Sequence, residues 1–244
     1  MRGLAEICFT THYDVNPRGL VGDTMMRVDG VSRPADDAAL ARYVDDVRKA
    51  HDQFFPRGLT VVLGIEFGWY RDCEEEAARI RRKFGFDYML AGVHDIADIC
   101  FCCTGRYETC FSRYSLENMV ELYYRDVISA ARSGLFNTIA HLDYYKKYGE
   151  KFYGPAIHEA HRPFLADVFS ALIESGTAIE VNTAARRRGF DSYYPRNEII
   201  NAARRAGVDI AHIGSDAHAP DQVGYDFDLA YVFAPNTAGG GDDD

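Results

Sequence analysis

The sequence predicts an α/β protein whose parallel strands form a closed or nearly closed barrel. Short apolar runs alternate with longer amphipathic segments along the 244 residues, which is typical of βα units with right-handed crossovers. The runs are almost continuously apolar, as expected for strands that are covered by helices. Histidines and carboxylates stand at the ends of five different runs, whereas an open, doubly wound sheet would place functional groups at one or two switch points.

The strand predictions rest on apolar runs that end at glycine or at polar residues. The second run is apolar apart from Thr60 and Gly64 and ends at Glu66, and the last reaches Gly214 before the polar residues begin. The six strands are predicted at 4–10, 59–65, 88–93, 136–140, 178–181 and 210–214.

Amphipathic segments between these runs predict the helices. Pro34 precedes the first, and the second has glutamates in its first turns and arginines in its last, which matches the helix dipole. The helices are predicted at 35–54, 72–84, 115–133, 156–175 and 196–206, with a last short one at 227–233. Polar, Cys-rich, Tyr/Lys-rich and Arg-rich loops separate them. We expect one domain over 1–234 and a disordered Gly/Asp tail over 235–244.

Composition narrows the function classes. The formal charge of −10 disfavours nucleic acid as the main partner, because phosphate backbones are bound by basic surfaces. The sequence shows no apolar run of the roughly 20 residues that span a membrane and no signal segment, so we expect a cytoplasmic protein with reduced cysteines. Cys100, Cys102, Cys103 and Cys110 crowd one region, but their spacing is not a paired Cys-x-x-Cys, and we do not expect them to bind zinc.

Six candidate ligands follow the strands. Imidazole and carboxylate groups are accepted by borderline and hard metal ions, and only a barrel brings five strand ends around one centre, so we predict a polynuclear metal site. Its residues are His12, Glu66, His94, His141, Asp216 and His218. The other histidines have structural interpretations. We expect His51 to face a helix end, His158 and His161 to face solvent, and His212 to be a satisfied histidine inside its strand.

The chain resembles the PHP-domain metallophosphoesterases and, among them, the histidinol-phosphate phosphatases. The resemblance implies a distorted seven-stranded (β/α) barrel, a TIM-like architecture, with up to three divalent ions of Zn, Mn or Fe at the strand ends. It also implies hydrolysis of a small phosphorylated substrate, L-histidinol phosphate, in histidine biosynthesis. The matching segments, in family order, are 3–14, 63–66, 87–94, 139–143, 146–149, 180–183, 194–195 and 214–218.

The resemblance assigns roles residue by residue. Glu66 matches the family's bridging carboxylate, and His94 and His141 match the imidazoles that complete one bridged site. Asp216 matches a ligand of the other bridged metal, while His12 and His218 match ligands of the third. Glu66, Asp216 and His218 are therefore the implied catalytic residues.

Two basic residues are implied to face the substrate phosphate. They are Lys147, at a position where the family more commonly has Arg, and Arg187, in a run of three arginines. An arginine can grip phosphate bidentately, whereas a lysine acts as a point charge.

The sequence departs from the family at one motif. It contains no His-x-His, which the family carries on its first strand, so we expect a barrel lacking its first strand and helix and holding fewer metals. Open barrel edges would favour a homo-oligomer. Two alternatives stay open: a PHP phosphoesterase with another phosphate substrate, and a metal-binding barrel that is catalytically impaired.

Overall fold

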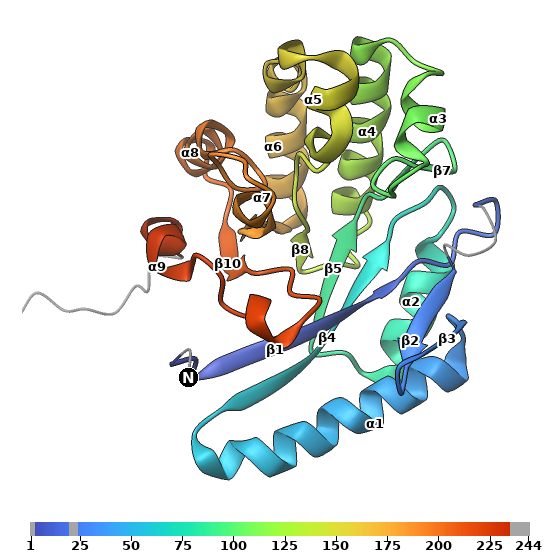
Figure 1. Ribbon diagram of the computed structural model, residues 1–244, viewed down its shortest axis with the longest axis vertical. Helices are drawn as coiled ribbons and strands as arrows, with labels where there is room; N and C mark the ends of the chain where they lie inside the picture. Colours follow the sequence, from blue (N-terminus) through green and yellow to red (C-terminus); the bar gives the residue numbers. More distant parts are fainter. Residues whose placement is uncertain (1–2, 20–23, 235–244) are drawn as a thin grey trace, which may run out of the picture.

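The fold is built on one parallel sheet of six strands. The structure is a computed structural model that describes residues 3–19 and 24–234. The sheet has the order β1-β4-β5-β8-β9-β10 and is curled into a half-barrel (Figure 1). Its strands are β1 (Glu6–Tyr13), β4 (Thr60–Gly68), β5 (Tyr88–Gly92), β8 (Thr138–Ile139), β9 (Ala178–Asn182) and β10 (Ile210–Gly214). The predicted α/β class, the six strands and their parallel order are confirmed.

The register of the sheet decides which strand ends meet. β1 and β4 pair over eight positions, and His12 on β1 lies directly beside Glu66 on β4. Because all six strands run in the same direction, their carboxyl ends share one edge of the sheet. β1 and β10 lie at the two ends of the order, and within the described ranges they are not paired with each other.

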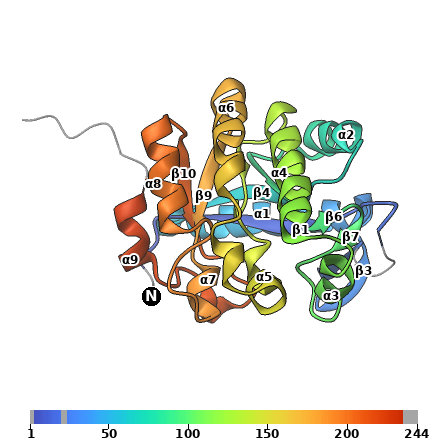
Figure 2. The ribbon, with the colours of Figure 1, turned by 90° about the horizontal axis from the view of Figure 1, so that it is seen from above.

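Helices cover the sheet as the sequence pattern predicts. In Figure 2, α2, α4, α6 and α8 stand in a row on one side, while the shorter α3, α5 and α7 lie on the other. Two helices start at side-chain caps: Asp36 accepts from the backbone N–H of Ala39, and Ser115 from that of Asn118. The longer helices are α1 (Asp37–Phe54), α2 (Glu74–Phe84), α4 (Leu116–Arg132), α6 (Leu165–Ser175) and α8 (Asn197–Ala206).

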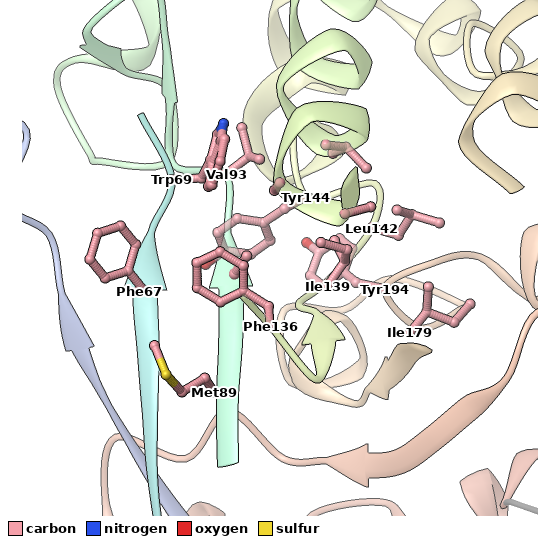
Figure 3. Close-up of a cluster of buried hydrophobic side chains, with 14 of the residues drawn as sticks. Phe67, Trp69, Met89, Val93, Phe136, Ile139, Leu142, Tyr144, Ile179 and Tyr194 are labelled. Atoms are coloured by element: carbon pink, nitrogen blue, oxygen red, sulfur yellow. The ribbon is translucent and has the colours of Figure 1, made fainter. Parts of the chain in front are cut away.

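The hydrophobic core lies between the strands and these helices. Phe67 on β4, Phe136 in the loop before β8, and Ile139 and Ile179 on β8 and β9 meet in one cluster (Figure 3). The rings of Phe67 and Phe136 are 5.8 Å apart between centroids, in a tilted contact. The core holds the strands together below the edge at which the polar residues gather.

The structure adds small elements that the sequence pattern did not predict. The polar loop after β1 contains an antiparallel hairpin, and the Cys-rich loop begins with another. Five further short helical segments occupy loops because local turns there satisfy the backbone, while the short helix predicted at 227–233 is present as α9 (Phe227–Ala230) and η5 (Tyr231–Phe233). The elements that were not predicted are β2 (Met25–Val28), β3 (Val31–Pro34), η1 (Phe55–Arg57), β6 (Asp95–Ile96), β7 (Ile99–Cys100), α3 (Tyr107–Phe111), α5 (Lys146–Tyr153), α7 (Ala184–Arg187) and η4 (Pro220–Gln222).

Several boundary predictions were wrong: the second strand continues to Gly68, and the fourth is only Thr138–Ile139. The first strand continues to Tyr13, because its pairing with β4 carries the ladder past His12. The helix predicted over 156–175 is broken into η2 (Pro155–His158), η3 (Arg162–Phe164) and α6, because Pro163 cannot donate within a continuous helix. The predicted disorder of 235–244 lies outside the described residues. In the ranges that the structure covers, no helix is long and apolar enough to cross a membrane.

Candidate metal centre

The predicted ligands come together at the carboxyl ends of the strands. Glu66 lies on β4, where the neighbouring β1 places His12 beside it. His94 and His141 follow β5 and β8 and are 7% and 2% exposed. Asp216 and His218 follow β10, at the far end of the sheet. The curl of the half-barrel therefore brings residues from its two edge strands to one centre, as the sequence predicted.

The centre of the cluster consists of one carboxylate and two imidazoles. Glu66 Oε1 lies 3.1 Å from His94 Nε2 and 2.9 Å from His141 Nε2, and the two Nε2 atoms are 3.3 Å apart. Three ligand atoms within this distance repel one another unless protons or a cation lie between them. The arrangement thus suits a cation.

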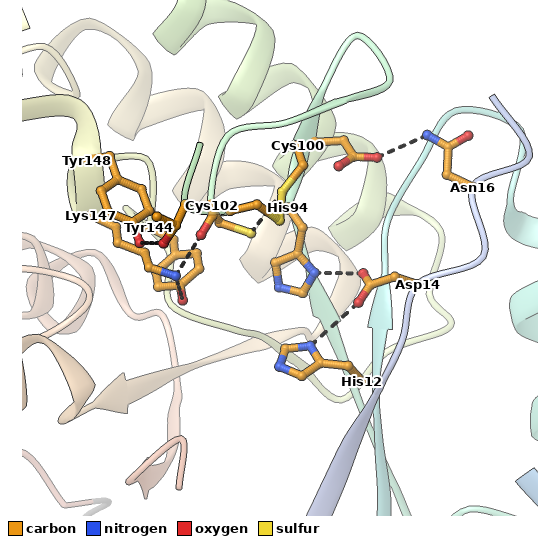
Figure 4. The surroundings of a disulfide bond; sticks show 12 residues. His12, Asp14, Asn16, His94, Cys100, Cys102, Tyr144, Lys147 and Tyr148 are labelled. Carbon is orange, nitrogen blue, oxygen red and sulfur yellow. Dashed lines mark hydrogen bonds and ion pairs between the residues drawn. A yellow bond between two sulfur atoms is a disulfide. The ribbon is translucent and has the colours of Figure 1, made fainter. Parts of the chain in front are cut away.

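Asp14 sets the orientation of His94. The His94 Nδ1–H donates to Asp14 Oδ1 at 2.8 Å, which directs the other ring nitrogen toward Glu66 (Figure 4). In the neutral ring, this tautomer leaves the lone pair on Nε2, where a metal ligand needs it. A carboxylate behind a histidine in this manner is a common support of metal sites.

A second group of ligand atoms adjoins the first. Atoms of His12, Asp216 and His218 lie within 4.8 Å of one another, as do atoms of His12, Glu66 and His94. His218 Nδ1 is 3.3 Å from Asp216 Oδ1, and the His12 and His218 rings are 5.5 Å apart. His12 belongs to both groups, so the ligand atoms form one connected cluster.

Two further observations indicate that this set of donor atoms fits divalent cations. The Nδ1 atoms of His12 and His141 are buried and make no hydrogen bond within the described part of the chain. Buried polar atoms are normally hydrogen-bonded, and a buried atom without a partner indicates a bound ion or a catalytic role. His12 Nδ1 also lies 3.8 Å from Glu66 Oε2, so this nitrogen faces a carboxylate without a proper hydrogen bond.

The surroundings shift the pKa values of the carboxylates Glu66 and Asp216 in opposite directions. Burial opposes ionisation of Glu66, but the charge of His12 and the hydrogen bonds from His141 and His94 outweigh it and hold the Glu66 pKa well below its usual value. Burial and the negative charge of Glu66 raise the pKa of Asp216. Burial also disfavours charge on His94, yet Asp14 and Glu66 raise its pKa. A cation in the cluster would favour the ionised form of both carboxylates.

Unusual backbone conformations fix two of the ligands. His141 and Asp216 have φ values of +29° and +48°, which few non-glycine residues adopt. The His141 N–H donates to Glu180 Oε1 at 2.8 Å. Arg187 donates from Nη2 to the Asp216 carbonyl at 2.8 Å and from Nη1 to the Ser215 carbonyl. These contacts hold both strained positions in place.

A cavity of about 1060 Å³ opens over the cluster. His12, His94 and His218 line it together with both basic residues implied to bind phosphate, Lys147 and Arg187. Lys147 Nζ donates to the Cys102 carbonyl at 2.7 Å and to the Tyr144 hydroxyl at 3.1 Å (Figure 4). Burial lowers the pKa of Lys147 and that of Arg187. The structure thus places both residues beside the ligand cluster.

The predictions for the other histidines have mixed outcomes. His212 is satisfied inside its strand, 3.2 Å from the Tyr88 hydroxyl, as predicted. His51 lies in the last turn of α1, but its Nδ1 contacts the Val61 carbonyl at 2.8 Å instead of only facing the helix end. The prediction for His161 and His158 was wrong. The break at Pro163 turns His161 inward, where it is 2% exposed, and leaves His158 half-buried.

The expectation of reduced cysteines was wrong for one pair. Cys100 and Cys103 form a disulfide, because the turn after β7 brings their Cα atoms to 5.9 Å. Cys8, Cys73, Cys102 and Cys110 are free.

Sequence reasoning missed two supporting carboxylates. Asp14 stands two residues after His12, and alternate residues of a strand face the same side, so the His-x-Asp spacing was a usable signal. Glu180 lies inside β9, and no strand-end position marked it. Its contact with His141 depends on two strands that are far apart in the sequence.

The fold and this cluster define a class, and the comparisons with known proteins identify it. The PHP domain family model matches residues 1–184, so the chain belongs to the PHP domain family. The match ends before Asp216 and His218, which the structure brings to the same cluster.

Several histidinol phosphatases are similar to this chain. It is 29% identical to a probable histidinol-phosphatase of Deinococcus radiodurans, over 92% of this chain and 79% of that protein. It is 24% identical to the histidinol-phosphatase of Bacillus subtilis, over 93% and 87%. These are the particular relatives against which its function can be considered.

Two solved structures share the fold. A putative histidinol phosphatase of Listeria monocytogenes superposes with a TM-score of 0.70 at 15% identity, covering 92% of this chain and 88% of that one. The histidinol phosphate phosphatase of Lactococcus lactis, solved with zinc, L-histidinol and phosphate, gives 0.66 at 20% identity, covering 88% and 75%.

Proposed function

We propose that this protein is a metal-dependent phosphomonoester hydrolase that converts L-histidinol phosphate and water to L-histidinol and phosphate. The observation that carries the proposal is the convergence of six histidine and carboxylate ligands from five strand ends beneath one cavity. The names of the similar proteins support the substrate, since the relatives are histidinol phosphatases and the Lactococcus lactis structure was solved with L-histidinol and phosphate.

The proposed metal ligands fall into two overlapping sets. Glu66, His94 and His141 would hold one cation, and His12, Asp216 and His218 would extend the cluster toward the cavity. The Lactococcus lactis structure was solved with zinc, and manganese and iron suit the same donors. Bound divalent cations lower the pKa of water, which provides a nucleophile near neutral pH, and stabilise charge on phosphoryl oxygens.

The protein's own residues would bind and orient the substrate. Lys147 offers a positive charge at the cavity wall, and its bonds to the Cys102 carbonyl and the Tyr144 hydroxyl fix where that charge lies. Arg187 uses two of its five N–H donors on the Ser215 and Asp216 carbonyls, which leaves three for phosphate oxygens. Arg187 would therefore hold both the substrate phosphate and the loop that carries Asp216.

A second candidate function is a metal-binding barrel without phosphatase activity. The observation that favours it is the absence of any His-x-His in the sequence, a motif that the family resemblance leads one to expect. This candidate predicts a protein that binds metal as tightly as an enzyme would and yet releases no phosphate.

Phosphate release separates these functions. Purified, zinc- or manganese-loaded protein is given L-histidinol phosphate, serine phosphate or p-nitrophenyl phosphate, with metal content measured on the same samples. The proposal predicts the highest kcat/KM for L-histidinol phosphate. Equal values for all three would remove the assigned substrate, and bound metal without any release would favour the second candidate. Glu66→Gln, which removes a charge and retains the shape, is the matched inactive control.

A further inference from the structure

Three cysteines gather on the wall of the cavity, beside the histidine and carboxylate cluster and not part of it. Cys100 ends β7, and Cys102 and Cys103 follow in the next turn (Figure 4). Their sulfur atoms all lie within 4.8 Å of one another, and Cys102 Sγ is 3.6 Å from Cys100 Sγ. Cys100 and Cys103 are joined as a disulfide, so the structure shows one state of a loop that contains three sulfurs.

The separation between Cys100 and Cys102 is close to that of two sulfur ligands of one ion. With Zn–S bonds of about 2.3 Å, sulfur ligands of one ion lie about 3.7–4.0 Å apart. The 3.6 Å between Cys100 and Cys102 is close to that spacing. Cys100 and Cys103 form a single Cys-x-x-Cys, the shortest spacing common in structural zinc sites; the sequence lacks the second Cys-x-x-Cys of a paired motif, and here Cys102 supplies the third sulfur. Little movement of the turn would thus place all three sulfurs around one ion.

The fold holds this loop in position independently of the disulfide. β6 and β7 pair Asp95 with Cys100, and the Phe101 N–H donates to the His94 carbonyl at 3.1 Å. Lys147 Nζ donates to the Cys102 carbonyl at 2.7 Å. Phe101 is fully buried between Cys100 and Cys102 and anchors the turn in the core. Such anchoring keeps the sulfurs close together after the S–S bond is reduced.

We propose that the reduced Cys100–Cys102–Cys103 loop is a second, thiolate metal site that takes a soft or borderline ion such as Zn²⁺, Cu⁺ or Cd²⁺. Thiolate ligands select these ions, whereas imidazole and carboxylate ligands also accept harder ones. The disulfide leaves only the Cys102 thiol, so disulfide and bound ion exclude each other. Burial raises the pKa of the Cys102 thiol, and an ion that binds there displaces its proton.

Interconversion of the two states is a two-electron change. When the S–S bond forms, the Cys100 and Cys103 thiols together lose two electrons and two protons. A small disulfide such as oxidised glutathione accepts them and is cleaved to two thiols. Reduction by a dithiol or phosphine reverses the change and returns the three-thiol form, so the redox state decides whether the site is available.

Cadmium absorption tests the proposal, because thiolate-to-cadmium charge transfer gives an ultraviolet band that imidazole and carboxylate ligands do not give. Full-length protein is reduced, freed of metal and titrated with Cd²⁺. We expect a thiolate band that saturates at one ion per chain, and no band in protein oxidised with glutathione disulfide. Cys102→Ser should lose about a third of the band and weaken Cd²⁺ binding at least tenfold.

Two controls separate this site from the others. Cys8→Ser, which removes a free thiol outside the loop, should leave the band unchanged. His94→Ala with His141→Ala should also retain it, because those ligands belong to the other cluster. No band in reduced wild type, a full band in Cys102→Ser, or a band that survives oxidation would each overturn the proposal. None of these outcomes depends on phosphatase activity.

Discussion

Gly92 gives a stringent perturbation of the ligand cluster, because it lies directly against two of the ligands. A Cβ atom at this position would lie 2.6 Å from Glu66 Oε1 and 2.7 Å from His94 Nε2. Ordinary contacts begin at 3.4 Å, so each ligand atom must retreat by about 0.7–0.8 Å in a Gly92→Ala variant. Metal sites tolerate deviations of only about 0.2 Å in their ligand distances. We expect metal affinity to fall by about 10- to 100-fold or more.

Gly64→Ala provides the matched control. Its Cβ would meet Cys8 Sγ at 2.6 Å and the Phe9 carbonyl at 2.8 Å, an equal overlap on the neighbouring strand β4 that contacts no proposed ligand. Both variants should lose roughly 1–3 kcal/mol of stability through overpacking, measured by denaturant unfolding of metal-free protein.

Competition with a chromophoric zinc chelator measures the affinities. Only Gly92→Ala should bind zinc more weakly than wild type, and Gly64→Ala should bind it normally once folded. Wild-type zinc affinity in Gly92→Ala would refute the reasoning, because the ligands would then not meet at this glycine.

Three further predictions concern other parts of the molecule. Arg187→Ala should raise KM for L-histidinol phosphate by a factor that corresponds to roughly 1.5–3 kcal/mol, because a charged hydrogen bond to the phosphate is lost. Arg186→Ala should leave KM unchanged, because the Arg186 side chain pairs with exposed Asp191 and does not line the cavity. An unchanged KM in Arg187→Ala would move the phosphate site elsewhere. Burial lowers the pKa of His161 from 6.5 to about 3, so between these pH values the unfolded state binds more protons than the folded state. The contribution of neutral His161 to the free energy of unfolding is therefore fully present above pH 6.5 and should decline by roughly 1–2 kcal/mol at pH 5. His161→Gln should flatten that pH dependence in urea unfolding, and an equally steep curve would assign the loss to other groups. In the described part of the chain β1 is an edge strand, and it carries Phe9, which is 43% exposed. An exposed apolar edge strand favours self-association, so light scattering should detect association that Phe9→Lys reduces. A monodisperse wild-type monomer would contradict this prediction.

The sequence predicted the sheet and the residues that converge at its carboxyl edge because both depend on local patterns. Apolar runs marked the six strands, and the polar residue that ends a run marked a proposed ligand, as with Glu66 at the end of the run 59–65, although β4 itself continues to Gly68. Parallel strand direction then sufficed to bring those ends together. The first strand was drawn too short at its end, because the pairing of His12 with Glu66 is a contact between strands and leaves no trace in hydrophobic periodicity.

Features that depend on distant contacts escaped prediction. His161 was expected in solvent, but the break at Pro163 turns it toward Lys146, 3.4 Å from its Nδ1. Glu180 supports His141 from another strand, and no spacing in the sequence links the two. The Cys100–Cys103 disulfide depends on the β6–β7 hairpin, which was missed because each of its strands has only two residues.

Metal-dependent release of phosphate tests the central claim most directly. Metal-free wild type and a His94→Ala, His141→Ala double variant are titrated with Zn²⁺, and bound metal and phosphate released from L-histidinol phosphate are measured on the same samples. We predict that release by wild type rises in step with bound metal, while the double variant, lacking both imidazoles beside Glu66, loses that metal and its activity. Release that is independent of metal, or a double variant that retains both metal and turnover, would contradict the account.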